Sequence, residues 1–251
     1  MEPNQYKYMF DAEDRHWWYV GNHEIFIELL KKHQLLKENI KVLDAGCGTG
    51  KWLQRLTSQA QVNYTGIDYH PQAVSLAKSR GVNNVMQADL NSYDASHNSL
   101  NLITSFDVIC SKDVDDKLAV PNFYNWLSED GNLLLSVPAY RFLLGKHDDV
   151  VHQNKRYCKK EVKKLLVENG FEIIKISYCV CLLFPVAVLK RWSDKVFKSK
   201  NAEHNEVKMP GKYINKFFLT IMRFEKFLLK HMSLPFGLSV IVLAKKSVID
   251  K

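Results

Sequence analysis

The segment "VLDAGCGTG", residues 42–50, carries the strongest indication of this chain's fold. Apolar residues lead to an acid and then to three glycines at alternate positions. Glycines this dense cost backbone entropy on folding, so they mark a tight turn or a close approach to another group. The stretch predicts a buried strand over 40–45, a glycine turn, and a helix over 51–60. Such a unit directs backbone N–H groups and the positive end of a helix dipole at one place.

The alternation of strand and helix continues along the chain. Further strands are predicted at 62–68, 82–90, 106–112, 132–140, 171–178 and 238–246, with helices at 70–81, within 118–131 and at 159–170. This alternation implies βαβ units and a mainly parallel sheet covered on both faces. Because the crossovers are right-handed, the fold class is α/β with a doubly wound sheet of seven strands.

Polar residues fall at or near the carboxyl ends of these strands, where such sheets bind ligands. They are Asp44, Asp68, Asp89 and Ser111. Asp68 lies about twenty residues beyond the first glycine, which suits an acid that grips ribose hydroxyls. The glycines follow a Gly-x-Gly-x-Gly spacing, whereas dinucleotide enzymes use Gly-x-Gly-x-x-Gly. The site therefore fits a nucleoside but serves a pyrophosphate poorly.

The glycine motif, followed by "GID" (66–68) and "ADL" (88–90), resembles the class I S-adenosylmethionine-dependent methyltransferases. The resemblance implies S-adenosyl-L-methionine as cofactor and a Rossmann-like sheet whose last strand, 238–246, is antiparallel. It also implies the cofactor site: Asp44, Gly46 and Gly48 at the methionine end, Asp68 on the ribose diol, Tyr69 on the adenine ring, Asp89 with Leu90 at the adenine amino group, and Ser111 closing the site. A side chain at Gly46 is expected to fill the space of the methionine moiety.

The segment "VPAYRFLLGKHDDVVHQNKRYCKKE" (137–161) leaves the same sheet edge and is expected to overhang the donor. It resembles a loop of some of these methyltransferases, in which a histidine and an acid precede a further histidine. We expect His147, supported by Asp148 or His152, to act on the acceptor, because histidine is the natural base near neutral pH. A solvated connection with a capping role is the alternative.

Many relatives carry an acid–histidine pair after the fourth strand, and this chain has "KDVDDK" (112–117) there. Asp113, Asp115 and Asp116 are the candidates to replace that pair. No pattern of histidine, cysteine and acid spacing matches a metal site, so no metal is expected.

Three parts of the chain are distinguished: an N-terminal helical lid (1–39), an S-adenosylmethionine-binding domain (40–178 and 238–251), and a helical insertion (179–237). The alternative for the first part is a helix packed on the flank of the sheet. Basic amphipathic helices are predicted at 182–198 and 213–231. Such helices lie on membrane surfaces, cap substrate pockets or form dimer interfaces, and all three alternatives stay open.

The net charge is +8, and most of the excess follows residue 150. It suits an anionic acceptor or an anionic membrane surface. Nucleic acid is not expected, because no base-flipping motif or nucleic-acid module is visible. An odd number of cysteines without a Cys-x-x-Cys pair, and an N-terminus without a signal peptide, predict a cytoplasmic location or the inner face of a membrane.

The sequence thus predicts an enzyme that transfers a methyl group from S-adenosylmethionine to a small-molecule, lipid-linked or sugar-linked acceptor, with oxygen as the expected target. Two alternatives remain. One is a donor-binding partner subunit that has lost catalysis. The other is a nicotinamide-dependent oxidoreductase, which the glycine spacing disfavours.

Overall fold

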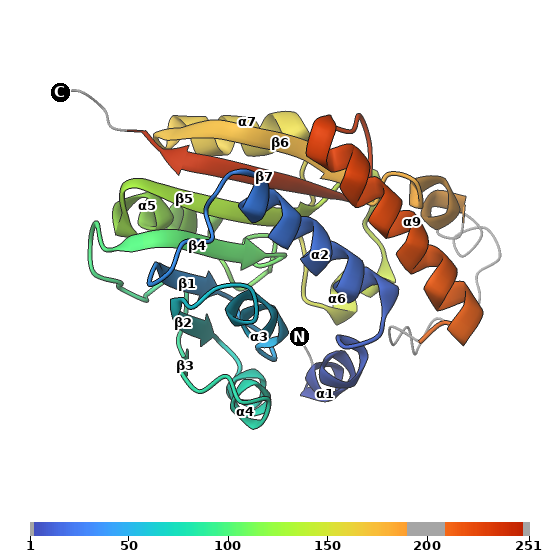
Figure 1. Cartoon of the computed structure of the whole chain (residues 1–251), viewed down its shortest axis with the longest axis horizontal. Coiled ribbons are helices and arrows are strands. Elements are labelled where there is room, and N and C mark those ends of the chain that lie inside the picture. Colours follow the sequence, from blue (N-terminus) through green and yellow to red (C-terminus); the bar gives the residue numbers. More distant parts are fainter. Residues whose placement is uncertain (1–2, 190–208, 248–251) are drawn as a thin grey trace.

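The computed structural model describes residues 3–189 and 209–247, which form a central sheet with helices on both faces (Figure 1). The sheet has seven strands in the order β3-β2-β1-β4-β5-β7-β6. The strands are β1 (Lys41–Ala45), β2 (Asn63–Asp68), β3 (Val85–Gln87), β4 (Leu100–Phe106), β5 (Leu127–Pro138), β6 (Phe171–Cys179) and β7 (Ser239–Lys246). Strand β7 runs antiparallel to β5 and β6, whereas the pairs among β1 to β5 are parallel. The predicted fold class is therefore confirmed.

The middle of the sheet is made of strands that are apolar on both faces. Leu133–Leu135 of β5 and Val240–Ala244 of β7 are buried and pair with one another. Strands covered on both sides read as continuous hydrophobic runs, because neither face meets water. These two runs therefore require a layer of helices above and below.

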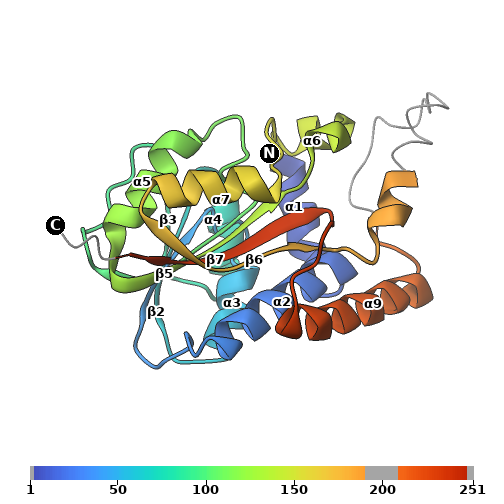
Figure 2. The same cartoon turned by 90° about the horizontal axis from the view of Figure 1, so that it is seen from above.

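The helices supply these two layers (Figure 2). One core packs α5 (Asp116–Trp126) and α7 (Lys159–Glu168) on the first face through buried side chains such as Phe123 and Leu166. The opposite core takes buried side chains from α2 (Trp17–Lys32), α3 (Lys51–Thr57), α4 (Pro71–Ser79) and α9 (Lys212–His231). A further helix, α1 (Pro3–Ala12), precedes α2. The carboxyl ends of the parallel strands lie at one edge of the sheet, close to α1 and the start of α2.

Helix α9 lies beside α2 in both views (Figures 1 and 2). Glu24 of α2 pairs with Arg223 and Lys226 of α9, each at 2.9 Å. Asn215 accepts a hydrogen bond from the backbone N–H of Trp17 at 2.9 Å, which caps the start of α2. The helix expected over 213–231 is thus part of the helical layer that covers the sheet.

Several predicted boundaries differ from the structure. The fourth strand is Leu100–Phe106, and the residues predicted as that strand, 107–112, form the turn that follows it. The predicted strand 82–90 shrinks to Val85–Gln87, and α5 ends at Trp126, after which β5 begins at once. Of the helix predicted at 182–198, the structure describes a helical turn at 184–189, and the remainder lies outside the described residues.

No helix in the described ranges 3–189 and 209–247 has the length and apolar character needed to cross a bilayer.

Candidate active site

The glycine turn after β1 has a backbone that only glycine adopts freely. The φ angles of Gly46, Gly48 and Gly50 are +86°, +53° and +77°, in the left-handed region that is costly for other residues. The N–H groups of Gly46 and Cys47 both donate to the carbonyl of Ile67 in β2, at 2.8 Å. The turn is therefore fastened to the neighbouring strand.

A side chain at Gly46 would meet protein. An added Cβ would lie 2.1 Å from Cγ2 of Val108, in the turn after β4. The expectation that a side chain at Gly46 would fill the space of the methionine moiety is therefore wrong, because that side chain would collide with Val108. At Gly48 the nearest atom is Cε of Met9 in α1, at 3.1 Å from an added Cβ. The glycine turn thus lies between the turn after β4 on one side and the N-terminal helix on the other.

Asp44, at the end of β1, is buried below this turn. Its Oδ1 accepts from the Thr104 hydroxyl at 2.7 Å, and that hydroxyl accepts from the indole N–H of Trp52 at 3.1 Å. Burial raises the pKa of Asp44 to about 7. A cationic ligand beside it would favour the carboxylate and lower that pKa.

Asp68, at the end of β2, accepts backbone hydrogen bonds on both oxygens. Gly48 donates to Oδ2 and His70 to Oδ1, each at 2.9 Å. The hydroxyl of Tyr6, from α1, also hydrogen-bonds this carboxylate. Burial is the main cause that raises the pKa of Asp68. A carboxylate has about four acceptor positions, so Asp68 combines a structural role with remaining capacity for a ligand.

The other residues expected at the cofactor follow the next strand ends. Asp89 accepts from the backbone and side-chain N–H groups of Asn91, at 2.9 and 3.0 Å. Leu90 is buried beside it, and Tyr69 is 64% exposed. Ser111 forms an isolated bridge with Gln153, so it ties the turn after β4 to the segment that follows β5.

All eight residues expected at the cofactor line one cavity of about 1030 Å³. They are Asp44, Gly46, Gly48, Asp68, Tyr69, Asp89, Leu90 and Ser111. The cavity lies at the carboxyl ends of β1, β2 and β4, where ligands bind in doubly wound sheets. Its volume is at the upper end of the range of small-molecule sites, about 300–1,000 Å³.

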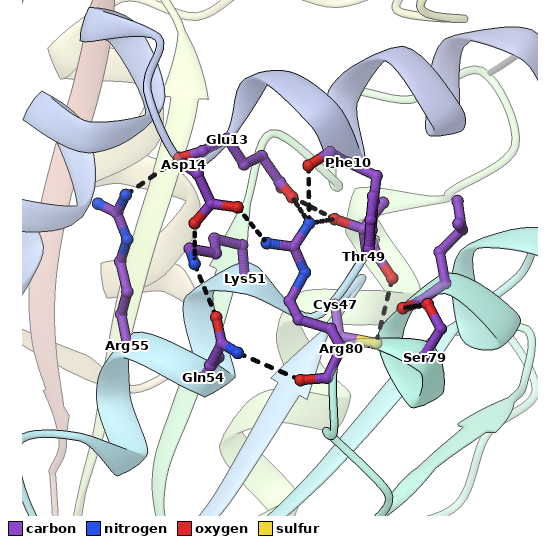
Figure 3. Close-up of polar contacts among 12 residues, drawn as sticks. Phe10, Glu13, Asp14, Cys47, Thr49, Lys51, Gln54, Arg55, Ser79 and Arg80 are labelled. Carbon is purple, nitrogen blue, oxygen red and sulfur yellow. Dashed lines mark hydrogen bonds and ion pairs between the residues drawn. The ribbon is translucent and has the colours of Figure 1, made fainter.

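Residues of the N-terminal helices line this cavity, and an ion network fastens the segment between these helices (Figure 3). Glu13 accepts from the hydroxyl of Thr49 in the glycine turn and pairs with Arg80 at 2.9 Å. Asp14 pairs with Lys51. Burial raises the pKa of Glu13 to about 7, although the Thr49 hydroxyl and Arg80 oppose this. Trp17, Trp18 and Tyr19, at the start of α2, add an aromatic wall.

Residues 21–176 match a family model described as a methyltransferase domain. The chain belongs to this methyltransferase family. The predicted membership of the class I S-adenosylmethionine-dependent methyltransferases is thereby confirmed. No curated protein matches the sequence.

Solved structures share the fold of this methyltransferase at low sequence identity. A phosphoethanolamine N-methyltransferase 2 of Haemonchus contortus, in complex with S-adenosylmethionine, is 16% identical with a TM-score of 0.59, over 89% of this chain and 52% of that one. This methyltransferase therefore spans about half of that neighbour. A Haloferax volcanii complex of a methyltransferase with its activator matches at 16% identity and a TM-score of 0.61, over 99% of this chain and 96% of that one. The [4+2]-cyclase SpnF matches at 15% identity and a TM-score of 0.55, over 87% and 81%.

The segment expected to carry the base is only partly directed at the cavity. Asp148 is buried and bonds Arg156, whose Nε and Nη2 lie 2.9 and 2.7 Å from Oδ1. Asp148 therefore orders this segment through Arg156. His152 lines the cavity, and its Nδ1 lies 3.9 Å from Asp113. His147 belongs to α6 (Lys146–Val150), but its side chain lies outside the described residues.

The three acids considered as substitutes for the acid–histidine pair have different positions. Asp115 caps α5 by accepting from the N–H of Lys117 at 2.9 Å. Asp116 accepts from Lys155 at 2.6 Å and from the Tyr157 hydroxyl at 2.7 Å. Asp113 alone of these three lines the cavity. The first two are therefore structural.

The cavity is also lined by Asn22 and His23 of α2 and by Asp107 directly after β4, which were not predicted as site residues from the sequence. Asp107 was placed inside the predicted strand 106–112, so its position at a strand end was hidden. The alternating apolar run "LNLITSF" (100–106) is the signal that would have placed the strand correctly. Asn22 and His23 carry no such signal, because polar residues in an amphipathic helix usually mark its solvent face.

Proposed function

We propose that this chain transfers a methyl group from S-adenosylmethionine to a hydroxyl group of a small or lipid-linked acceptor. The observation that supports this most strongly is the convergence of the glycine turn, Asp44 and Asp68 on one cavity at the sheet edge. The chain's methyltransferase family sets the reaction class. The acceptor atom and the acceptor class are the parts that the proposal adds.

The residues present fit the cofactor. The buried Asp44 would pair with the ammonium of the methionine part, beside the glycine backbone. Asp68 would accept from the ribose hydroxyls with the lone pairs left by its two backbone donors. The exposed ring of Tyr69 and the side chain of Leu90 would pack on the adenine, with Asp89 at its amino group.

Bound S-adenosylmethionine would supply an electrophilic methyl group on a sulfonium centre. The chain would position the acceptor in line with it, and positioning of this kind is a large source of rate. We propose that α1 and α2 act as the lid, because Tyr6, Glu13 and the start of α2 cover the site. His147 was predicted as the base and His152 as its support. Because the side chain of His152 lines the cavity, we propose that His152 takes the hydroxyl proton, with His147 as the alternative.

An apolar wall supports a lipid-linked or amphipathic acceptor. Leu183, Val186 and Ala187, after β6, line the cavity together with Phe218 of α9. These residues come from other elements than the acids assigned to the donor, which lie at the ends of β1 to β3. This wall gives the acceptor an apolar surface of its own.

The first experiment separates a donor binder from an inactive fold. S-adenosylhomocysteine should raise the unfolding temperature of the protein, because a ligand that binds only the native state stabilises it. Acceptor candidates with and without lipid or sugar groups should then be screened for the mass of one added methyl group. The absence of a thermal shift would contradict the proposal, as would a shift without transfer to any hydroxyl-bearing acceptor.

We also propose that α9 rests on an anionic membrane surface. Tyr213, Phe217, Phe224 and Phe227 are 55–88% exposed and follow each other at helical spacing on one side of α9. The basic Lys212 and Lys216 are exposed among the first of them. Aromatic side chains with flanking cations suit the headgroup region of a membrane. This surface adjoins the apolar wall through Phe218, so a lipid-linked acceptor could enter from the membrane.

Co-sedimentation with vesicles tests this placement. Binding to vesicles with anionic lipid is expected at low salt and should weaken as salt rises. Phe217→Ser with Phe224→Ser should reduce binding, and Val167→Ser, at an exposed apolar position of α7, is the matched control. Equal sedimentation of both variants would contradict the membrane role. If wild type formed dimers and the variant with Phe217→Ser and Phe224→Ser did not, the aromatic surface of α9 would be a dimer interface instead.

A further inference from the structure

Three buried polar atoms without a hydrogen-bond partner in the described structure belong to residues that line the cavity. They are Oδ1 of Asn22, Nδ1 of His23 and Oδ1 of Asp107. Asn22 and His23 are each only 8% exposed. Native proteins satisfy most buried polar atoms, since an unpaired one carries a desolvation penalty. Unpaired atoms in residues that line one cavity therefore indicate where a polar group of a ligand binds.

Aromatic packing holds these three residues at one place. The ring of Phe26 in α2 stacks on that of Phe106, the last residue of β4, with centroids 4.2 Å apart. Asn22 and His23 precede Phe26 by four and three residues, so they lie on the same side of the helix. Asp107 directly follows Phe106. The stack therefore brings this α2–β4 cluster (Asn22, His23 and Asp107) together.

The cluster lies beyond the methionine end of the proposed donor site. The sheet order β3-β2-β1-β4 places the adenine, ribose and methionine residues on the first three strands, and β4 comes next. Val108, beside Asp107, lies against the glycine turn, since a Cβ on Gly46 would be 2.1 Å from its side chain. A ligand group that contacts the cluster would thus lie next to the methionine end of the donor, on the side from which the acceptor must approach.

The chemistry of the cluster suits a group with hydrogen atoms to donate. Burial lowers the pKa of His23 to about 3, so its imidazole is neutral. Burial raises the pKa of Asp107 to about 7. Among the described residues Asp107 forms no salt bridge, and the nearby Arg156 is engaged by Asp148. Asp107 also has a φ of +58°, a strained backbone of the kind found at functional sites.

We propose that Asn22, His23 and Asp107 bind the O–H or N–H group of the acceptor that receives the methyl. This inference rests on the proposed function of the cavity. It assigns the specificity for the reacting group to α2 and to the residue after β4. Asn22 and Asp107 accept hydrogen bonds from the acceptor, and the neutral imidazole of His23 completes the wall.

A donor analogue tests this without knowledge of the acceptor. In sinefungin a carbon replaces the donor's sulfur and an amine on it replaces the methyl, so the amine takes the place of the methyl and points toward the acceptor side. S-adenosylhomocysteine lacks that amine. Wild type should bind sinefungin about 10-fold or more tightly than S-adenosylhomocysteine, the scale of a hydrogen bond to a charged group. In calorimetry, Asp107→Asn should lose this preference and keep its affinity for S-adenosylhomocysteine. Asn22→Ala should reduce the preference for sinefungin over S-adenosylhomocysteine about 3-fold.

Asp130→Asn is the control, because Asp130 is an exposed acid of β5 outside the cavity, so the preference should not change in this variant. Equal weakening of both ligands by Asp107→Asn would overturn the inference, since Asp107 would then serve the donor or the fold. An unchanged preference in Asp107→Asn would overturn it as well. If wild type bound neither ligand, the proposed function itself would fail, which is a separate result.

Discussion

The two halves of the cavity are built in different ways. Apart from Ser111, which follows β4, the residues assigned to the donor lie at the ends of β1, β2 and β3 or within a short turn after them. The other half combines α2, the turn after β4, the segment after β5 and α9, which are far apart in sequence. The first half is local in sequence and tied by backbone hydrogen bonds. The second half depends on packing between residues far apart in sequence, and the side chains of α2 and α9 determine its chemistry.

The largest effect is expected at Gly46, where the two halves meet. Gly46→Ala should lower the free energy of unfolding by about 3–5 kcal/mol, from left-handed strain and the contact with Val108. Gly81→Ala is the control, because Gly81 has a φ of +87° but nothing within 4 Å of an added Cβ. Urea unfolding should show a smaller loss there. Equal losses would mean that the two halves are not in contact at Gly46.

Removal of the base should affect only the acceptor half. His152→Ala should lower single-turnover methyl transfer by about 10²–10⁴-fold, the usual contribution of a general base, with S-adenosylmethionine affinity nearly intact. His147→Ala is the comparison variant. A loss at His147 alone would move the role to that residue. If neither variant were slower, the site would work by positioning alone.

The same comparison shows what the sequence could and could not predict. The fold, and the convergence of the eight expected residues on one cavity, could be predicted because motif, strand end and acid lie within a few residues of one another, as at Asp44 and Gly46. The role of Asp148 could not be predicted. It accepts a hydrogen bond from Arg156, and sequence spacing does not reveal that contact. Asn22 and His23 could not be found, because packing between residues far apart in sequence, such as the Phe26–Phe106 stack across eighty residues, brings them to the site.

The pH should move stability and donor affinity in opposite directions. Burial raises the pKa values of Asp44 and Glu13 to about 7, above their values in an unfolded chain. A raised folded pKa contributes stability that is present below the unfolded pKa and is lost as pH rises through 7. The donor-free protein should therefore unfold at higher temperature at pH 5.5 than at pH 8.

Donor binding should have the reverse dependence, because the donor's ammonium needs Asp44 as a carboxylate. The affinity for S-adenosylmethionine should rise from pH 5.5 to pH 8, and Asp44→Asn should remove most of that slope. Calorimetry at several pH values measures both. A slope that survives in Asp44→Asn would assign the proton to another group, and a flat profile in wild type would contradict the role of Asp44.

The division of the cavity is tested most directly by calorimetric titration of S-adenosylmethionine into paired variants. Asp68→Ala, in the donor half, should weaken binding by about 1.5–3 kcal/mol, the scale of hydrogen bonds to a charged group. Asp113→Ala, in the acceptor half, should leave the affinity within error of wild type. Unchanged affinity in Asp68→Ala, or an equal loss in Asp113→Ala, would contradict the account.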